Sequence, residues 1–208
     1  MPVICVGGVA GVGKSTIIDE ARDRLEAEEY NVYSVGTFMF EEAERRGLVE
    51  DRDQMRFLDE SVQDQLKDYA VGQLIERSEA GENIVLDSHY VIPTPDGYLP
   101  GLPDEDLERI GVDAYVLLFA DPQVISERRV SDPSRQRDMD PLDEIARDQY
   151  RESEKAHDVA ARTNVPLYVI DTTHDNPSGY GERLSAVIDD IDERTGYDGD
   201  GPEVYNLC

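Results

Sequence analysis

The chain has 208 residues, of which 47 are acidic and 20 are basic, so its formal net charge is -27. This length suits one globular domain with a sizeable core. The acidity argues against nucleic acid and anionic membranes as partners, because both require a basic surface. Only three residues, Lys14, Lys67 and Lys155, are lysines. An acidic, lysine-poor composition suits a very salty, halophilic cytoplasm, where salt screens the repulsion between surface charges.

The ends of the chain predict a cytoplasmic protein. The first residues, MPVICVGG, indicate a buried strand with no basic segment before it, so no secretory signal is expected. No run approaches the roughly 18 apolar residues that would cross a bilayer. The two cysteines, Cys5 and Cys208, lie far apart and indicate neither a disulfide framework nor a zinc site.

Short aliphatic runs alternate with amphipathic stretches along the chain. The runs typical of buried parallel strands are Val3 to Val6, Val32 to Val35, Ile84 to Leu86, Ala114 to Phe119 and Leu167 to Ile170. The apolar faces typical of helices are Ile17, Ile18, Ala21 and Leu25; Val62, Leu66, Ala70 and Leu74; and Leu184, Val187, Ile188 and Ile191. This alternation predicts an α/β fold, with a five-stranded parallel sheet covered by helices on both faces.

Two further helix starts and a terminal segment complete the predicted organisation. Asp121-Pro122 and Asp140-Pro141 each place an N-cap acceptor before a proline at the first helical position. Residues 195–208, TGYDGDGPEVYNLC, show no periodicity and are predicted to form a flexible tail. The domain is therefore expected to occupy residues 1–194.

The strongest motif is GVAGVGKS, which fits the phosphate-loop pattern G-x-x-x-x-G-K-[ST]. A strand precedes it and an amphipathic helix follows, as such a loop requires. Backbone N–H groups would surround the β-phosphate of a nucleoside triphosphate, Lys14 would span the β- and γ-phosphates, and the Ser15 hydroxyl would bind Mg²⁺. The predicted nucleotide-binding residues are Gly8, Val9, Ala10, Gly11, Val12, Gly13, Lys14, Ser15 and Thr16.

Asp87 closes the apolar run NIVLD and is a second candidate for the magnesium site. A carboxylate at this place in a phosphate-loop fold holds or orients the metal shell through water. The alternative is a strand-end aspartate that faces solvent. His89, two residues further on, is interpreted as a structural histidine.

Four arginines, Arg128, Arg129, Arg135 and Arg137, lie within ten positions of this acidic chain. A small-molecule kinase must exclude water from the γ-phosphoryl group and neutralise the charge of the transition state, and a short arginine-bearing lid does both. The alternative is a solvated helix end with local charge pairs. A signalling GTPase is not favoured, because no asparagine precedes any of the lysines as its guanine-reading N-K-x-D motif needs.

An acceptor substrate that carries a phosphate would need anion-binding groups of its own. Thr37, Arg52 and Arg56 follow the second predicted strand, in TFMFEEAERRGLVEDRDQMR, and are candidates for that role. Arg52 and Arg56 also have acidic neighbours with which they could pair.

Four segments together resemble the archaeal-type adenylate kinases: GVAGVGKST, VGTFMFEEAERRGLVEDRDQMR, LDSHYVIPTPDGYLPGLP and ADPQVISERRVSDPSRQRD. The resemblance extends from the first strand to the last helix, and the composition is that of a haloarchaeal member. It implies a phosphate-loop NTPase fold and reversible transfer between MgATP and AMP to give two ADP. It also implies an AMP-side region at about 36–80, a short lid at about 128–140 and a homotrimer.

The resemblance assigns Lys14, Arg128, Arg135 and Arg137 to catalysis, and Thr37 and Arg52 to the AMP side. Arg129 is left out of the catalytic set as a solvated neighbour. The segment after Asp87 lacks the D-G-F-P-R-[ST] stretch of bacterial and eukaryotic adenylate kinases, so the AMP site must be built differently. Two alternatives remain: a kinase for another monophosphate or small molecule, and an NTP-binding regulatory protein with weak hydrolysis.

Overall fold

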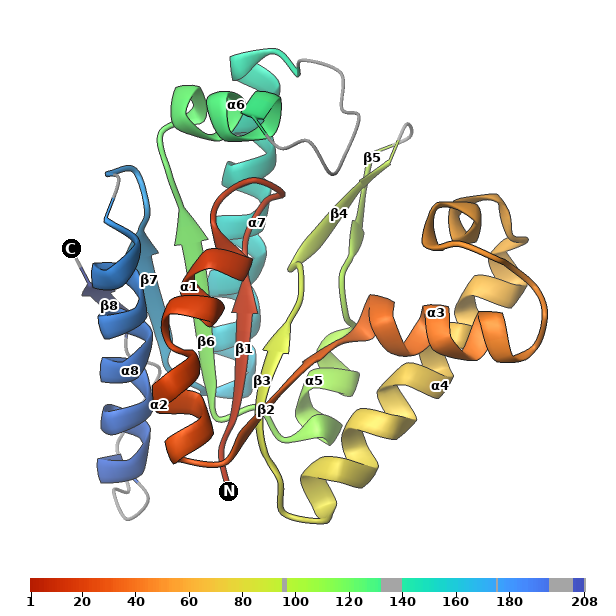
Figure 1. The fold of residues 1–208 in the computed structure, drawn as a ribbon, viewed down its shortest axis with the longest axis horizontal. Helices are drawn as coiled ribbons and strands as arrows, with labels where there is room; N and C mark the ends of the chain where they lie inside the picture. Colours follow the sequence, from red (N-terminus) through yellow and green to blue (C-terminus); the bar gives the residue numbers. More distant parts are fainter. Residues whose placement is uncertain (95–96, 132–139, 175, 195–203, 208) are drawn as a thin grey trace.

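A central parallel sheet organises the computed structural model, which describes residues 1–94, 97–131, 140–174, 176–194 and 204–207, without the side chains of 53, 56, 192–194 and 204–207. Its strand order is β2-β3-β1-β6-β7-β8 (Figure 1). The strands are β1 (Val3–Gly7), β2 (Tyr30–Ser34), β3 (Asn83–Asp87), β6 (Ala114–Phe119), β7 (Leu167–Asp171) and β8 (Val204–Leu207). All five pairings within it are parallel, so the carboxyl ends of its strands meet along one edge.

Helices cover both faces of the sheet, as the alternation of strands and helices predicts. On one face lie α1 (Lys14–Glu20), α2 (Arg22–Ala27) and α8 (Pro177–Arg194), and on the other α4 (Glu60–Glu79), α5 (Asp104–Ile110) and α7 (Leu142–Thr163) (Figure 1). Because side chains alternate along a strand, Ile4 and Val6 of β1 join the first core cluster while Val3 and Cys5 join the second. Both faces of β1 are thus buried, which explains its unbroken apolar sequence.

The second core cluster extends into an arm that projects beside the sheet. The arm consists of α3 (Val35–Arg45), the 3-10 helix Arg52–Phe57 and the outer part of α4 (Figure 1). Ala43, Val49 and Leu66 form a third, smaller cluster between α3 and α4. This arm coincides with the region predicted to bind the acceptor.

The five predicted strands are confirmed, with one difference at a boundary. Val35 does not end β2 but begins α3, because β2 stops at Ser34. The antiparallel hairpin of β4 (Val91–Thr94) and β5 (Gly97–Pro100) was not predicted. Each strand has only four residues and each includes a proline, so the apolar periodicity is too short to read.

Four residues of the predicted flexible tail, residues 195–208, form a strand instead. Val204–Leu207 form β8, which pairs in parallel with β7 and adds a sixth strand at the edge of the sheet. Four residues are too few to show a hydrophobic periodicity in the sequence. The strand forms because β7 offers it a hydrogen-bonding partner, not because of local strand preference. Within the described ranges, no helix has the length and apolar character to cross a membrane.

The two predicted aspartate caps have different outcomes. Asp121 caps α6 (Pro122–Ser131), because its carboxylate accepts the N–H of Gln123 at 2.8 Å. Asp140 does not cap α7, whose N-cap position is Pro141. The Asp140 carboxylate pairs with Arg129 instead, because a buried guanidinium is the stronger partner.

Candidate active site

The phosphate loop connects the end of β1 to the start of α1 at the carboxyl edge of the sheet. Gly8, Gly11 and Gly13 have φ angles of 147°, 85° and 116°, in the region that favours glycine. A Cβ on Gly8 would also lie 2.8 Å from the carbonyl oxygen of Leu118. Backbone conformation therefore favours glycine at all three positions, and at Gly8 the close approach to β6 requires it as well.

Lys14 lies folded over this loop. Its Nζ donates to the carbonyl oxygen of Gly8 at 2.7 Å and lies 3.5 Å from Nδ1 of His89. Ser15 and Thr16 follow in the first turn of α1 with exposed side chains. Lys14, Ser15 and Thr16 thus occupy the first three positions of α1, directly after the loop.

Asp87 ends β3 beside the phosphate loop. In the register of the sheet it lies opposite Val6 on β1 and Ser34 on β2. Within the described part of the chain, no group of three His, Cys, Asp or Glu side chains could hold a metal by itself. A hydroxyl and a single carboxylate fit a Mg²⁺ that arrives with the phosphates of its nucleotide, since Mg²⁺ binds through one or two carboxylates plus substrate oxygens.

The Arg52 guanidinium lies over Gly36 in the first turn of α3, the turn that also carries Thr37. Arg52 crosses over the backbone of α3 so closely that a Cβ on Gly36 would lie 2.3 Å from its Nη2. The Arg52 guanidinium and the positive end of this 11-residue helix, with Thr37 in its first turn, make a candidate anion-binding corner. The side chain of Arg56 lies outside the described set.

Arg128 binds a backbone carbonyl of the phosphate loop. Its Nη1 donates to the carbonyl oxygen of Val12 at 3.0 Å, and its Nη2 donates to that of Thr172 at 2.7 Å. Thr172 is fully buried, and its hydroxyl also donates to Val12. Arg128 therefore ties the phosphate loop to the segment that follows β7.

Arg129 binds the same loop and was missed by the sequence interpretation. Its Nε donates to the carbonyl oxygen of Ala10 at 2.8 Å, and its Nη1 pairs with Asp140. The side chain is only 9% exposed, so its interpretation as a solvated neighbour was wrong. No sequence signal distinguishes it, because its burial depends on where α6 packs. Arg135 and Arg137 lie outside the described residues.

A buried polar cluster beneath the loop was also missed. Glu152 of α7 is 2% exposed and accepts the N–H groups of Tyr90 and Val91 at 2.8 and 3.3 Å. The Tyr90 hydroxyl lies 3.1 Å from the carbonyl oxygens of both Cys5 and Val116, and burial raises its pKa well above the ordinary value. A sequence signal did exist, because Glu152 shares a helical face with Ala156 and Val159 and is the charged member of an apolar stripe.

Burial also sets the chemistry of the one cysteine in this cluster. It raises the pKa of the Cys5 thiol to about 12, and the charges of Glu152 and Asp87 add to the effect. Cys5 is therefore a protonated core residue rather than a nucleophile.

Comparison with known proteins shows the family to which this chain belongs. Residues 7–146 match the family model described as an AAA domain. The chain is 36% identical over 194 residues to an adenylate kinase of Thermococcus onnurineus, across 93% of this chain and 97% of that relative. It belongs to the adenylate kinase family. An adenylate kinase of Thermoplasma volcanium is 45% identical over 142 residues, which cover 67% of this chain and 74% of the relative.

A solved structure supports the fold independently of this family. A sugar kinase from Janibacter superposes with a TM-score of 0.52 at 17% identity, covering 91% of this chain and 95% of that one. At that identity the similarity concerns the fold alone. The adenylate kinase family and the phosphate-loop geometry agree with the predicted α/β class.

Proposed function

We propose that the protein is an adenylate kinase, a phosphotransferase that moves the terminal phosphoryl group of MgATP to AMP and reverses the reaction from two ADP. One observation carries the proposal: two anion-binding corners flank Asp87 at the same edge of the sheet. One is the phosphate loop after β1, and the other is Thr37 with Arg52 after β2. Two such corners suit two phosphate-bearing substrates placed for in-line transfer.

The donor nucleotide would bind the phosphate loop through residues 8–16. Their backbone N–H groups would bind the β-phosphate, and Lys14 would move from the Gly8 carbonyl to the β- and γ-phosphates. Ser15 and Asp87 would hold Mg²⁺, which when bound supplies positive charge to the β- and γ-phosphates. Lys14 provides the remaining charge on the protein side.

The acceptor would bind the corner at α3. Arg52 and Thr37 would hold the AMP phosphate, with Arg56 as a third candidate, and the arm at about 36–80 would form the acceptor region. A general base is unnecessary because the attacking phosphate oxygen of AMP is already anionic.

The lid arginines complete the proposed transfer site. Arg135 and Arg137, in the lid at about 128–140, would bind the migrating phosphoryl group together with Arg128. The contacts of Arg128 support a part in fixing the phosphate loop as well. Replacing Arg137 with Ala should lower kcat far more than it lowers the melting temperature, and near-normal turnover would remove Arg137 from the mechanism.

A single assay separates this function from its alternatives. ATP is incubated with each nucleoside monophosphate in turn, and ADP formation is followed by a coupled reaction. Rapid ADP formation with AMP alone supports adenylate kinase, whereas a preference for CMP or UMP supports a related kinase. Hydrolysis that does not depend on the acceptor supports an NTP-binding regulatory protein.

The remaining parts of the proposal concern the setting of the enzyme. The acidic, lysine-poor composition supports a haloarchaeal origin and a cytoplasmic location, where ATP, ADP and AMP are available. A homotrimer is what the resemblance to archaeal-type adenylate kinases implies. The exposed pair Ile92 and Leu99 on the β4–β5 hairpin, 44% and 57% exposed, supports a contact between copies there. Light scattering in molar KCl would test the trimer.

A further inference from the structure

The buried carboxylate of Glu152 lies one side chain away from the catalytic lysine. Its Oε2 accepts the N–H groups of Tyr90 and Val91, and its Oε1 lies 3.4 Å from Nδ1 of His89. The same Nδ1 lies 3.5 Å from Nζ of Lys14. His89 thus stands between the interior of the protein and the phosphate loop.

The backbone around His89 is fixed on both sides. Ser88 donates its N–H to the carbonyl oxygen of Val6 at 3.0 Å, and Gly101 donates to that of Tyr90 at 3.0 Å. A Cβ on Gly101 would lie 1.7 Å from the carbonyl oxygen of His89, so the hairpin packs directly against this segment. The side chain of His89 is 42% exposed, so its ring stands at the boundary between the core and solvent.

The ring nitrogen between the two charged groups can serve only one of them at a time. An ammonium group only donates hydrogen bonds and a carboxylate only accepts them. With its proton on Nε2, the neutral ring accepts a hydrogen bond from Lys14 at Nδ1. With its proton on Nδ1, the ring donates to Glu152. The two contacts therefore belong to two alternative states of His89.

We propose that His89 is a positioning residue for phosphoryl transfer, which holds Lys14 over the phosphate loop before the nucleotide binds and pairs with Glu152 once Lys14 binds the nucleotide. The inference rests on the proposed function, because it assigns a partner to the lysine of that reaction. A lysine held in advance loses less conformational freedom on binding phosphate. Glu152 then receives a donor at the moment when Lys14 leaves His89.

The test compares three variants with wild-type enzyme. His89→Ala removes the nitrogen, whereas His89→Asn keeps a group near Nδ1 that can accept or donate. Glu152→Gln retains an oxygen for the N–H groups of Tyr90 and Val91 but turns an amide donor toward His89, where it competes with Lys14.

The expected result is a loss of about tenfold in kcat/KM for ATP with His89→Ala and with Glu152→Gln, the size of one good hydrogen bond. The KM for AMP should not change, and His89→Asn should restore most of the activity. The double variant should lose no more than either single variant, because both changes break one connection.

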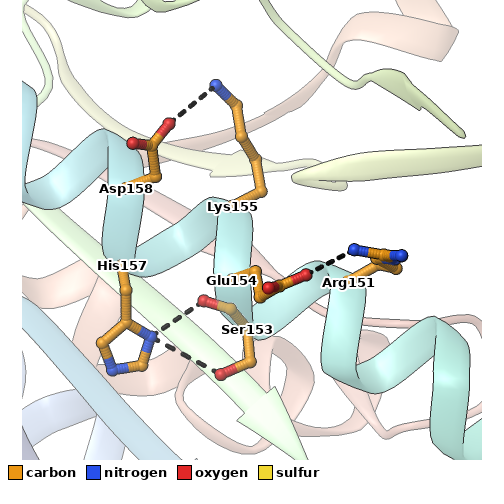
Figure 2. Close-up of a pocket in the computed structure, with 6 residues that line it drawn as sticks. All are labelled: Arg151, Ser153, Glu154, Lys155, His157 and Asp158. Carbon is orange, nitrogen blue, oxygen red and sulfur yellow. Dashed lines mark hydrogen bonds and ion pairs between the residues drawn. The ribbon is translucent and has the colours of Figure 1, made fainter.

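Two residues on the outer face of α7 provide matched controls (Figure 2). Nδ1 of His157 lies 2.8 Å from the carbonyl oxygen of Ser153, and Glu154 pairs with Arg151 at 2.7 Å, so both are engaged away from the site. His157→Ala and Glu154→Gln should leave kcat, both KM values and the melting temperature unchanged.

Calorimetric binding of a non-hydrolysable ATP analogue gives a readout that does not depend on AMP. Weaker binding by His89→Ala at an unchanged melting temperature supports the inference. The inference is overturned if His89→Ala binds the analogue and turns over substrate like the wild type. It is also overturned if a lowered melting temperature accounts for the whole loss of binding and activity. If the wild-type enzyme binds ATP but does not phosphorylate AMP, the proposed function fails while the binding comparison still decides the role of His89.

Discussion

Arg129 donates a hydrogen bond from Nε to the carbonyl oxygen of Ala10, 2.8 Å away, and so supports the phosphate loop from its outer side. A loop that turns its N–H groups inward around phosphate turns its carbonyl oxygens outward. Arg128 donates to the carbonyl oxygen of Val12, two residues further along the same loop. Two successive arginines of α6 therefore hold the phosphate loop by its outward carbonyl oxygens.

Replacing Arg129 with Ala should destabilise the fold as well as the site. The change leaves the carbonyl of Ala10 and the carboxylate of Asp140 without their buried partner, which should lower the free energy of unfolding by about 1–3 kcal/mol. Urea titration in molar KCl measures this change. Arg109→Ala is the matched control, because Arg109 is 65% exposed and should give a midpoint like that of the wild type. An unchanged midpoint for Arg129→Ala would contradict the role.

Replacing Lys14 with Ala should lower turnover by roughly 10²- to 10³-fold without unfolding the protein. Lys14 is the one lysine of the loop, and loss of a single charge-stabilising donor costs roughly 10²–10³ in kcat. Its hydrogen bond to Gly8 closes within the loop, so the melting temperature should change little. A variant that keeps normal turnover would refute the phosphate-loop mechanism. Lys67→Ala, at a half-buried position of α4 outside the phosphate loop, serves as the lysine control.

Replacing Arg52 with Ala should affect AMP and not ATP. A hydrogen bond to a charged group contributes about 1.5–3 kcal/mol, so KM for AMP should rise about 10- to 100-fold at constant KM for ATP. Initial rates with one substrate varied at a time separate the two constants. Arg22→Ala provides the control, since Arg22 pairs with Asp19 on the surface of the donor side. Equal increases in both KM values would mean that Arg52 does not act at the acceptor corner.

Glu42 should make stability depend on acid pH. Hydrogen bonds from Arg45 and then Arg46 lower the pKa of this carboxyl from 4.5 to about 2. A depressed folded-state pKa contributes stability that is complete above pH 4.5 and is lost as the pH falls toward 2. Glu42→Gln should therefore melt below the wild type at pH 6, and the two melting temperatures should converge as the pH falls through this window. A constant difference at all pH values would disprove the linkage.

Salt should raise both stability and activity. At about 1 M salt the screening length falls to roughly 3 Å, so the repulsion among the acidic side chains becomes weak. Melting temperature and turnover should increase toward molar KCl. Sucrose at equal osmolarity should not reproduce the increase in turnover, because it does not screen charge. An optimum in dilute buffer would refute the halophilic interpretation.

The parts of the fold that depend on local sequence could be predicted. Each of the five aliphatic runs became a strand, because a strand buried on both faces must be apolar at every position. The glycines of the phosphate loop encode a backbone conformation directly, so their spacing predicts geometry as well as chemistry.

The parts that depend on contacts between distant segments could not be predicted. The helices of Arg129 and Glu152 also carry exposed charged residues such as Glu127 and Glu154, and the sequence does not distinguish them. The packing of α6 and α7 is what buries Arg129 and Glu152. β8 forms because it pairs with β7. Asp140 does not cap α7 as expected but pairs with the guanidinium of Arg129, 11 positions earlier in the chain. The roles of Arg128, Thr37 and Arg52 stay predictions, although the structure places Arg52 over the turn of α3 that carries Thr37.

The separate cluster of Ala43, Val49 and Leu66 has a consequence for how the molecule opens. The outer ends of α3 and α4 are held by this cluster, while the two sheet faces have clusters of their own. Separating the arm's outer ends therefore exposes little of the main core and requires less free energy than global unfolding. Backbone amides near Ala43 should exchange with deuterium well before those of β1, and the acceptor arm would thus form a cooperative unit distinct from the sheet.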